Sequence, residues 1–282
     1  MSTCSFSNIV DPDIYQGEVP RELFAAMQKQ APIVWQNDPV YGVGYWAVTS
    51  QQHLDYVSKN AAIFSSEEKS CFYPEHNDDI LAMMRTQLIC MDPPDHVKFR
   101  RVIRNAFTPK MVESYTDHFR EIVKDVVNKV IDKGECEFVT DIACQLPLIA
   151  ICELVGVPLE DREDFFNWTN TMIGGDDLEL NISEEEAQMA AANVYLYADK
   201  LMAMHRENPS NDLVGALLDG VVAGESLTED EFRGFILLLM VAGNETTRTM
   251  TSQGMRILMQ HPDQWQMLVE NPALIPDAIE EM

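Results

Sequence analysis

The chain has 282 residues, of which 46% are hydrophobic and 23% are charged, a composition typical of a folded protein with a sizeable core. Its formal charge of −26 at neutral pH argues against nucleic acid as a partner, because a phosphate backbone would be repelled. The longest apolar run, 235–242, is far shorter than the roughly 20 residues of a membrane-spanning helix. Residues 1–6 contain no basic residue and no apolar run, so we expect no signal peptide, no membrane anchor and a cytoplasmic location.

The first predicted elements are a short helix around 20–30 and a β-hairpin region at about 31–50, where two strand-like runs flank a turn. The polar stretch 65–90 is predicted to be irregular, either a mobile loop over a substrate pocket or a disordered loop. Thr108 is expected to cap the next helix, with Pro109 in its first turn. Further helices are predicted around 140–156, 160–173, 183–206 and 211–220.

A long helix is predicted at about 229–261. Thr228 and Glu231 form a capping-box pair at its start, and the run 235–242 is apolar all round, as in a helix buried in a core. Gly243 then interrupts the pattern and costs about 1 kcal/mol relative to Ala in a helix interior. Such local misfits tend to mark function or strain.

The residues at the centre of this helix suit proton delivery. Gly243 has no Cβ, so a flat ligand can approach the backbone. The Thr246 hydroxyl can donate a hydrogen bond to the carbonyl of Ala242, four residues back, which can open a local bulge. With the Glu245 carboxylate, the site would hold a groove, a hydroxyl and an acid next to a bound small molecule.

The segment 242–247, Ala-Gly-Asn-Glu-Thr-Thr, resembles the oxygen-activating helix of the cytochrome P450 monooxygenases. The segment 91–101 is similar to the family's helix with a His-x-x-x-Arg pair, and 278–282 resembles the opening of its Glu-x-x-Arg helix, cut before the Arg. Three motifs in this order carry the resemblance from about residue 15 to the last residue. It implies a mainly α, cytochrome P450-like helical fold with a small N-terminal β region, as a single incomplete domain over 1–282.

The resemblance also implies a haem cofactor. His96 and Arg100, four apart on a predicted helix at about 93–107, would hydrogen-bond its propionates. The family holds the iron with a Cys thiolate in a Gly-rich loop near its C-terminus, and none of the six cysteines here has that context. The cysteines are expected to be reduced thiols, with Cys144 and Cys152 buried. We therefore expect the first two thirds of a family member, with no metal ligand of its own and haem bound only with the missing C-terminal part.

For the long helix, the resemblance implies that Glu245 and Thr246 are catalytic and relay protons during oxygen activation. Ala242 and Gly243 would bind the cofactor by lining the haem face and the oxygen groove. The implied function is a soluble bacterial monooxygenase that hydroxylates an apolar substrate with O2 and ferredoxin-supplied electrons. Stretches such as 44–49 resemble the steroid and terpenoid hydroxylase branch, so the expected substrate is a sterol, a terpenoid or a branched lipid.

Five basic residues fall within the stretch 98–110 of this acidic chain. In the family, the matching helix lies on the haem face where a small acidic ferredoxin docks, and complementary charge steers such partners. An ordinary solvated helix face is the open alternative. The residues are Arg100, already assigned to the propionates, and the docking candidates Lys98, Arg101, Arg104 and Lys110.

Two other functions remain open. A haem-free, truncated helical binding module is favoured by the absence of the Cys loop. A metal-dependent hydrolase is disfavoured, because the six histidines form no His-x-x-x-His or His-Glu-x-x-His site. Apolar residues before the central motif, Phe235 and 238–240, and the stretch 172–175 are either substrate-pocket lining or plain core.

Overall fold

The structure of the protein is a computed structural model, and it confirms the mainly helical fold with a small N-terminal sheet. The chain forms two compact units, the first comprising 1–85 and 90–93, and the second 86–89 and 94–282. The single domain over 1–282 stays a prediction. The structure describes residues 6–17, 19–38, 42–71, 77–174, 181–209, 212–221, 224 and 226–282, without the side chains of 105, 106, 110, 111 and 159.

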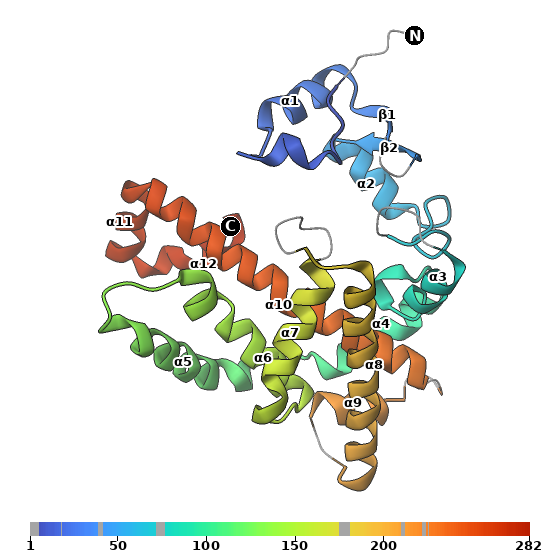
Figure 1. Cartoon of the computed structure of the whole chain (residues 1–282), viewed down its shortest axis with the longest axis vertical. Coiled ribbons are helices and arrows are strands. Elements are labelled where there is room, and N and C mark those ends of the chain that lie inside the picture. The colour runs from blue at the N-terminus through green and yellow to red at the C-terminus, as the bar shows by residue number, and fades with distance from the viewer. Residues whose placement is uncertain are drawn as a thin grey trace. The chain divides into compact units, whose positions relative to one another are not determined.

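The first unit contains an antiparallel pair of strands and short helices (Figure 1). The strands pair so that Trp35 lies opposite Trp46, with 5.2 Å between the ring centroids, which confirms the predicted hairpin. Part of its turn lies outside the described residues. The elements are η1 (Pro12–Tyr15), α1 (Arg21–Gln30), β1 (Ile33–Asn37), β2 (Gly44–Val48), α2 (Gln51–Lys59) and α3 (Asp78–Met84).

The stretch 65–90 is more regular than its composition predicts. It contains the helix α3 and a 3-10 turn, η2 (Leu88–Cys90). The Asn77 side chain accepts a hydrogen bond from the Ile80 amide at 3.0 Å, and acidic residues in the first turn favour the helix N-terminus. The prediction of an irregular stretch is wrong there, because N-capping outweighs the polar composition. Residues 72–76 lie outside the described part of the chain.

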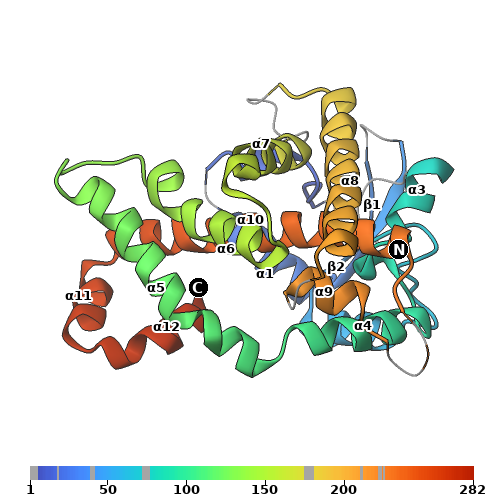
Figure 2. The same ribbon diagram turned by 90° about the horizontal axis from the view of Figure 1, so that it is seen from below.

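The second unit is built around α10 (Glu229–Gln260), against which α6, α7 and α8 pack (Figures 1 and 2). Each helix predicted in this region is confirmed, with ends that differ by a few residues. The other elements are α4 (Asp95–Ala106), α5 (Pro109–Ile131), η3 (Val139–Ala143), α6 (Gln145–Val155), η4 (Leu159–Asp161), α7 (Arg162–Ile173), α8 (Glu184–Glu207), α9 (Leu213–Leu218), α11 (Pro262–Glu270), η6 (Pro272–Leu274) and α12 (Ile275–Glu281).

The start of α10 is fixed by the predicted capping box. The Glu231 amide donates to the Thr228 hydroxyl at 3.2 Å, and the Thr228 amide donates to the Glu231 carboxylate at 2.7 Å. These reciprocal bonds satisfy two backbone donors that a helix end leaves unpaired. Among the helices described, none combines the length and apolar character needed to cross a bilayer.

The N-terminal half of α10 lies in the core. Phe232 and Ile236 are fully buried and Met240 is 2% exposed, so one face is buried at four-residue spacing. Phe235 meets Phe99 of α4, with 6.1 Å between the ring centroids. Burial of each such side chain contributes about 1.5–3 kcal/mol relative to exposure. This half therefore anchors the helix, and its central residues are held in a fixed position.

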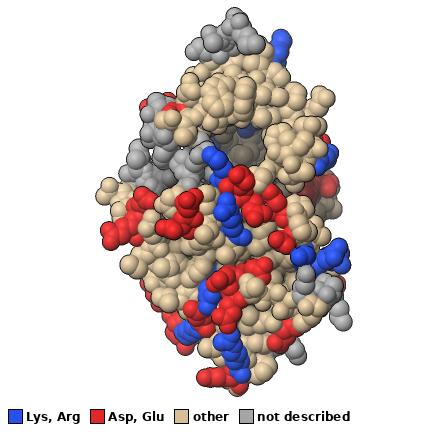
Figure 3. Space-filling model, turned by 90° about the vertical axis from the view of Figure 1, so that its right-hand side faces the viewer, with Lys and Arg blue, Asp and Glu red and all other residues tan. Residues whose placement is uncertain are grey.

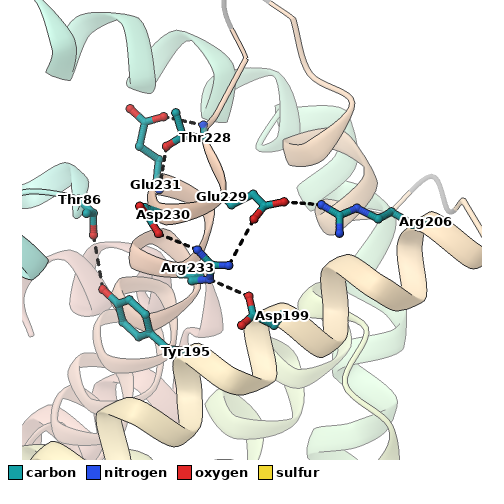
Figure 4. Close-up of polar contacts among 9 residues, drawn as sticks. All are labelled: Thr86, Tyr195, Asp199, Arg206, Thr228, Glu229, Asp230, Glu231 and Arg233. Carbon is teal, nitrogen blue, oxygen red and sulfur yellow. Dashed lines mark hydrogen bonds and ion pairs between the residues drawn. The ribbon is translucent and has the colours of Figure 1, made fainter.

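Acidic and basic side chains are interleaved on the surface, as the face in Figure 3 shows. Figure 4 shows such an arrangement where α10 starts beside α8. Arg233 donates to Asp199 of α8 at 2.7 Å and to Asp230 of its own helix at 2.6 Å. Arg206 of α8 donates to Glu229 at 2.5 Å. Exposed ion pairs contribute at most about 1 kcal/mol each, so this network mainly sets how α8 and α10 align.

Close packing requires a glycine at position 234 of α10. A Cβ at Gly234 would lie 2.5 Å from Oγ1 and 2.8 Å from the carbonyl oxygen of Thr86, so the backbone would have to shift. We expect Gly234→Ala to lower the free energy of unfolding by about 1–3 kcal/mol, although Ala favours a helix by about 1 kcal/mol. Urea unfolding followed by circular dichroism measures this change.

Gly254→Ala is the matched control in the same helix. Its Cβ would meet Met282 Sδ at 2.6 Å, and this flexible side chain can move away. That variant should leave the free energy of unfolding unchanged or raise it by up to about 1 kcal/mol. Equal stability of the two variants would contradict the packing explanation.

Candidate functional site

Thr246 and Ala242 lie on an exposed face in the middle of α10. The Thr246 hydroxyl donates to the Ala242 carbonyl at 2.5 Å, as predicted from their spacing, and both residues are exposed. The predicted bulge does not form, because α10 stays α-helical without interruption from Glu229 to Gln260. The hydroxyl proton is thus engaged inside the helix, and the oxygen can still accept a hydrogen bond from a ligand.

Gly243 faces a neighbouring helix. A Cβ at this position would lie 2.4 Å from Cδ1 and 3.0 Å from Cγ1 of Ile151 in α6, so a larger residue would require this side chain to move. The glycine therefore lets α6 pack closely on α10. Its predicted place beside a cofactor groove stays a prediction, as does that of Ala242.

The Glu245 carboxylate is held by side chains on both of its oxygens. Arg248 donates to Oε2, and Thr249 Oγ1 donates to Oε1 at 3.1 Å. Arg248 also donates through Nη1 to Oδ1 of Asn170 in α7, at 2.7 Å. The acid therefore belongs to a hydrogen-bonded chain that connects two helices. The motif itself gives no sign of these partners, and the only signal in the sequence is the three-residue spacing of Glu and Arg.

His96 and Arg100 lie on α4, which touches α10 at Phe99 and Phe235. Phe235 precedes Ala242 by seven residues, about 10 Å along a helix. His96 is half-buried and Arg100 is exposed. Within the described part of the chain, neither side chain has a hydrogen bond or an ion pair. Two free donors one turn apart can bind a pair of carboxylates.

The proposed docking residues are only partly defined by the structure. Arg101 and Arg104 are exposed on α4, whereas Lys98 pairs with Asp95 of the same helix at 3.2 Å. The side chain of Lys110 lies outside the description. Arg101 and Arg104 are thus accessible from solvent on α4.

The described cysteines have the properties of plain thiols. Cys90, Cys144 and Cys152 are buried, as predicted for the last two. Burial raises the pKa of the Cys144 thiol, and it raises the pKa of Cys152 to about 11. Burial and the neighbouring Cys90 raise the pKa of Cys71 to about 12. A raised pKa favours the neutral thiol, whereas an iron ligand is a thiolate.

The described residues fit two parts of a haem. The unpartnered His96 and Arg100 suit its propionates, and the small, exposed residues Ala242 and Thr246 allow a flat ring to approach α10. The cysteines just described do not fit the axial position. No cluster of three or more His, Cys, Asp or Glu side chains that could hold a metal ion occurs among the residues described.

Among the apolar candidates for a substrate pocket, Phe235 and Met240 belong to the core, whereas Leu238, Leu239, Met172 and Ile173 are half-buried and Gly175 lies outside the described residues. Phe235 is 5% exposed and Met240 is 2% exposed, both packed inside the second unit. A pocket of about 440 Å³ lies elsewhere, between the end of α10, α11 and α12. Its lining is entirely apolar, including Met255, Leu268 and Ile279, and contains none of the candidate site residues. We therefore do not place the chemistry there.

Comparison with known proteins adds independent evidence. The steroid C26-monooxygenase of Rhodococcus jostii is 36% identical, in an alignment that covers 96% of this chain and 59% of that relative. The linalool 8-monooxygenase of Pseudomonas putida is 29% identical, and the alignment covers 98% of this chain and 69% of that relative. The chain thus spans about 60% of the length of the first of these curated relatives. No protein-family model matches the chain.

A solved structure shows the same architecture. The cytochrome P450 hydroxylase of the leinamycin biosynthetic pathway of Streptomyces atroolivaceus aligns with a TM-score of 0.77 and 29% identity. The alignment covers 95% of this chain and 67% of that one. The chain therefore shares the fold of that protein, as the sequence predicts.

Proposed function

Because the chain belongs to the cytochrome P450 family, we propose that the whole protein is a haem-thiolate monooxygenase. It inserts one oxygen atom of O2 into a C–H bond of an apolar substrate, with electrons from a ferredoxin. The observation that carries the proposal is the exposed Thr246 hydroxyl beside the ordered Glu245 carboxylate on α10. Proton transfer to a ligand requires an acid or a hydroxyl within hydrogen-bond reach of that ligand.

In this proposal His96 and Arg100 hold the haem by its propionates. When bound, haem supplies the iron at which O2 is activated. Both side chains are donors without a partner in the described chain, so binding costs them no existing hydrogen bond. The axial thiolate is not assigned to Cys71, Cys144 or Cys152, whose raised pKa favours the neutral thiol.

Thr246 and Glu245 deliver protons in this mechanism. The Thr246 oxygen accepts a hydrogen bond from a group on the exposed face of α10, while its own proton rests on the Ala242 carbonyl. Glu245 is the nearest acid along the helix, and its side chain is 27% exposed, so solvent can reach it. Close packing of α6 at Gly243 keeps the helix from shifting as protons move.

The proposed substrate is a sterol, a terpenoid or a branched lipid. The relatives named above act, by their names, on a steroid and on linalool. Electrons are proposed to arrive from an acidic ferredoxin that docks on α4 and the start of α5. The candidate contacts are Lys98, Arg101, Arg104 and Lys110, on a chain whose overall charge is −26.

Thr246→Ala tests the catalytic hydroxyl. We expect the variant of the whole, haem-loaded protein to consume O2 but to form at least about tenfold less product per O2, because the hydroxyl oxygen that accepts a hydrogen bond in the proton relay is gone. Product by mass spectrometry and O2 by electrode give this ratio. Thr251→Ala is the control, because its hydroxyl makes the same kind of bond, to Thr247 O at 2.8 Å. An unchanged ratio of product to O2 in Thr246→Ala would show that this hydroxyl does not have the proposed role.

Arg100→Ala tests the propionate contact. A charge-assisted hydrogen bond contributes about 1.5–3 kcal/mol, so the variant should lose about 10- to 100-fold in haem affinity. Haem transfer to an acceptor protein, followed by absorbance, measures this loss. Arg101→Ala, an exposed neighbour on α4, should retain haem like the parent protein.

Unchanged haem affinity in Arg100→Ala would remove that residue from the site. If the parent protein itself binds no haem, the monooxygenase proposal fails. The haem-free binding module then becomes the better account.

A further inference from the structure

Arg248 connects the acid of the proposed site to a different helix. One of its terminal nitrogens donates to the Glu245 carboxylate, one turn earlier in α10. The other donates to Oδ1 of Asn170 in α7, at 2.7 Å. These three residues form a continuous hydrogen-bonded chain from α7 to the centre of α10, at a place where the two helices pack together.

Both oxygens of the acid are engaged in this arrangement. Oε2 accepts from Arg248, and Oε1 accepts from Thr249 at 3.1 Å. The carboxylate is therefore oriented toward the following turn of α10 by two residues outside the Ala-Gly-x-Glu-Thr segment. Rotation of the carboxylate away from this position breaks at least one of these bonds.

The geometry requires an arginine. Its planar guanidinium presents two terminal nitrogens in a rigid fork, so one can bind Asn170 while the other binds Glu245. A lysine has one ammonium nitrogen and cannot hold the two partners in the same way. The side chains of Arg248 and Glu245 are only 19% and 27% exposed, so solvent screens this pair less than a typical surface pair.

We propose that Arg248 and Asn170 are positioning residues for Glu245, so that α7 helps to set where this acid points. The inference rests on the proposed function, in which Glu245 delivers protons. A positioned acid must lie within hydrogen-bond reach of its target, and a shift of about 1 Å is enough to lose much of the effect. A change in α7 at Asn170 is thus transmitted to the proton-delivering group without touching it.

The first test is structural and does not depend on activity. Crystal structures of the whole protein and of its Asn170→Ala variant are compared at Glu245. The inference predicts that Arg248 turns in the variant and that the carboxylate leaves its contacts with Arg248, Thr249 or both. A carboxylate that keeps both contacts without Asn170 overturns the inference. Asn170→Asp retains the acceptor oxygen, so it should keep the original arrangement.

The second test is a double-mutant cycle in the haem-loaded protein, with product formed per O2 consumed as the readout. Asn170→Ala and Arg248→Lys should each lower this ratio by about three- to thirtyfold. In a Glu245→Gln background the same changes should have no further effect, because the positioned acid is gone. Equal losses in both backgrounds would show a merely structural role and overturn the inference. Asn170→Asp, which retains the acceptor oxygen, should form as much product per O2 as the parent protein.

Arg233→Gln is the matched control for both tests. Arg233 is also an arginine of α10 that connects to another helix, but its partner is Asp199 of α8 (Figure 4). This variant should leave the ratio and the position of Glu245 unchanged. If the parent protein forms no product at all, the proposed function fails. The crystal structures then still decide whether Asn170 and Arg248 orient Glu245.

Discussion

The burial of the first half of α10 is the constraint on which the second unit depends. Phe232, Ile236 and Met240 occupy the core on one face, and Phe235 packs on α4. These contacts fix the helix along its length and about its axis. As a result, the next turns present Ala242 and Thr246 on an exposed face. A polar site on a rigid element is held more precisely than one on a loop.

Three residues at the centre of α10 each contact a different partner. Thr246 binds the carbonyl of its own helix, Gly243 accepts the approach of α6, and Glu245 is connected through Arg248 to α7. Each of these contacts limits the motion of one group that the proposed chemistry uses. The helices α6 and α7, which are distant from α10 in the sequence, thereby help to fix the positions of these residues.

Much of this arrangement could be predicted from local sequence signals. The capping box at Thr228 and Glu231 gave the start of α10, and the four-residue spacing of Thr246 and Ala242 gave their hydrogen bond. The missed features depend on contacts rather than on pattern. The helix α3 forms in a polar stretch because of the cap at Asn77, and the bond from Arg248 to Asn170 joins residues 78 positions apart. No periodicity reveals such a pair.

The most direct test of the central claim is the origin of the product oxygen. The whole, haem-loaded protein is given cholesterol or linalool, a ferredoxin and its reductase, and O2 enriched in oxygen-18. The account predicts a hydroxylated product that carries one oxygen-18 atom, with the other atom of the same O2 released as water. A product whose new oxygen comes from unlabelled water would contradict it, as would haem-loaded protein that consumes no O2 with any apolar substrate of these classes.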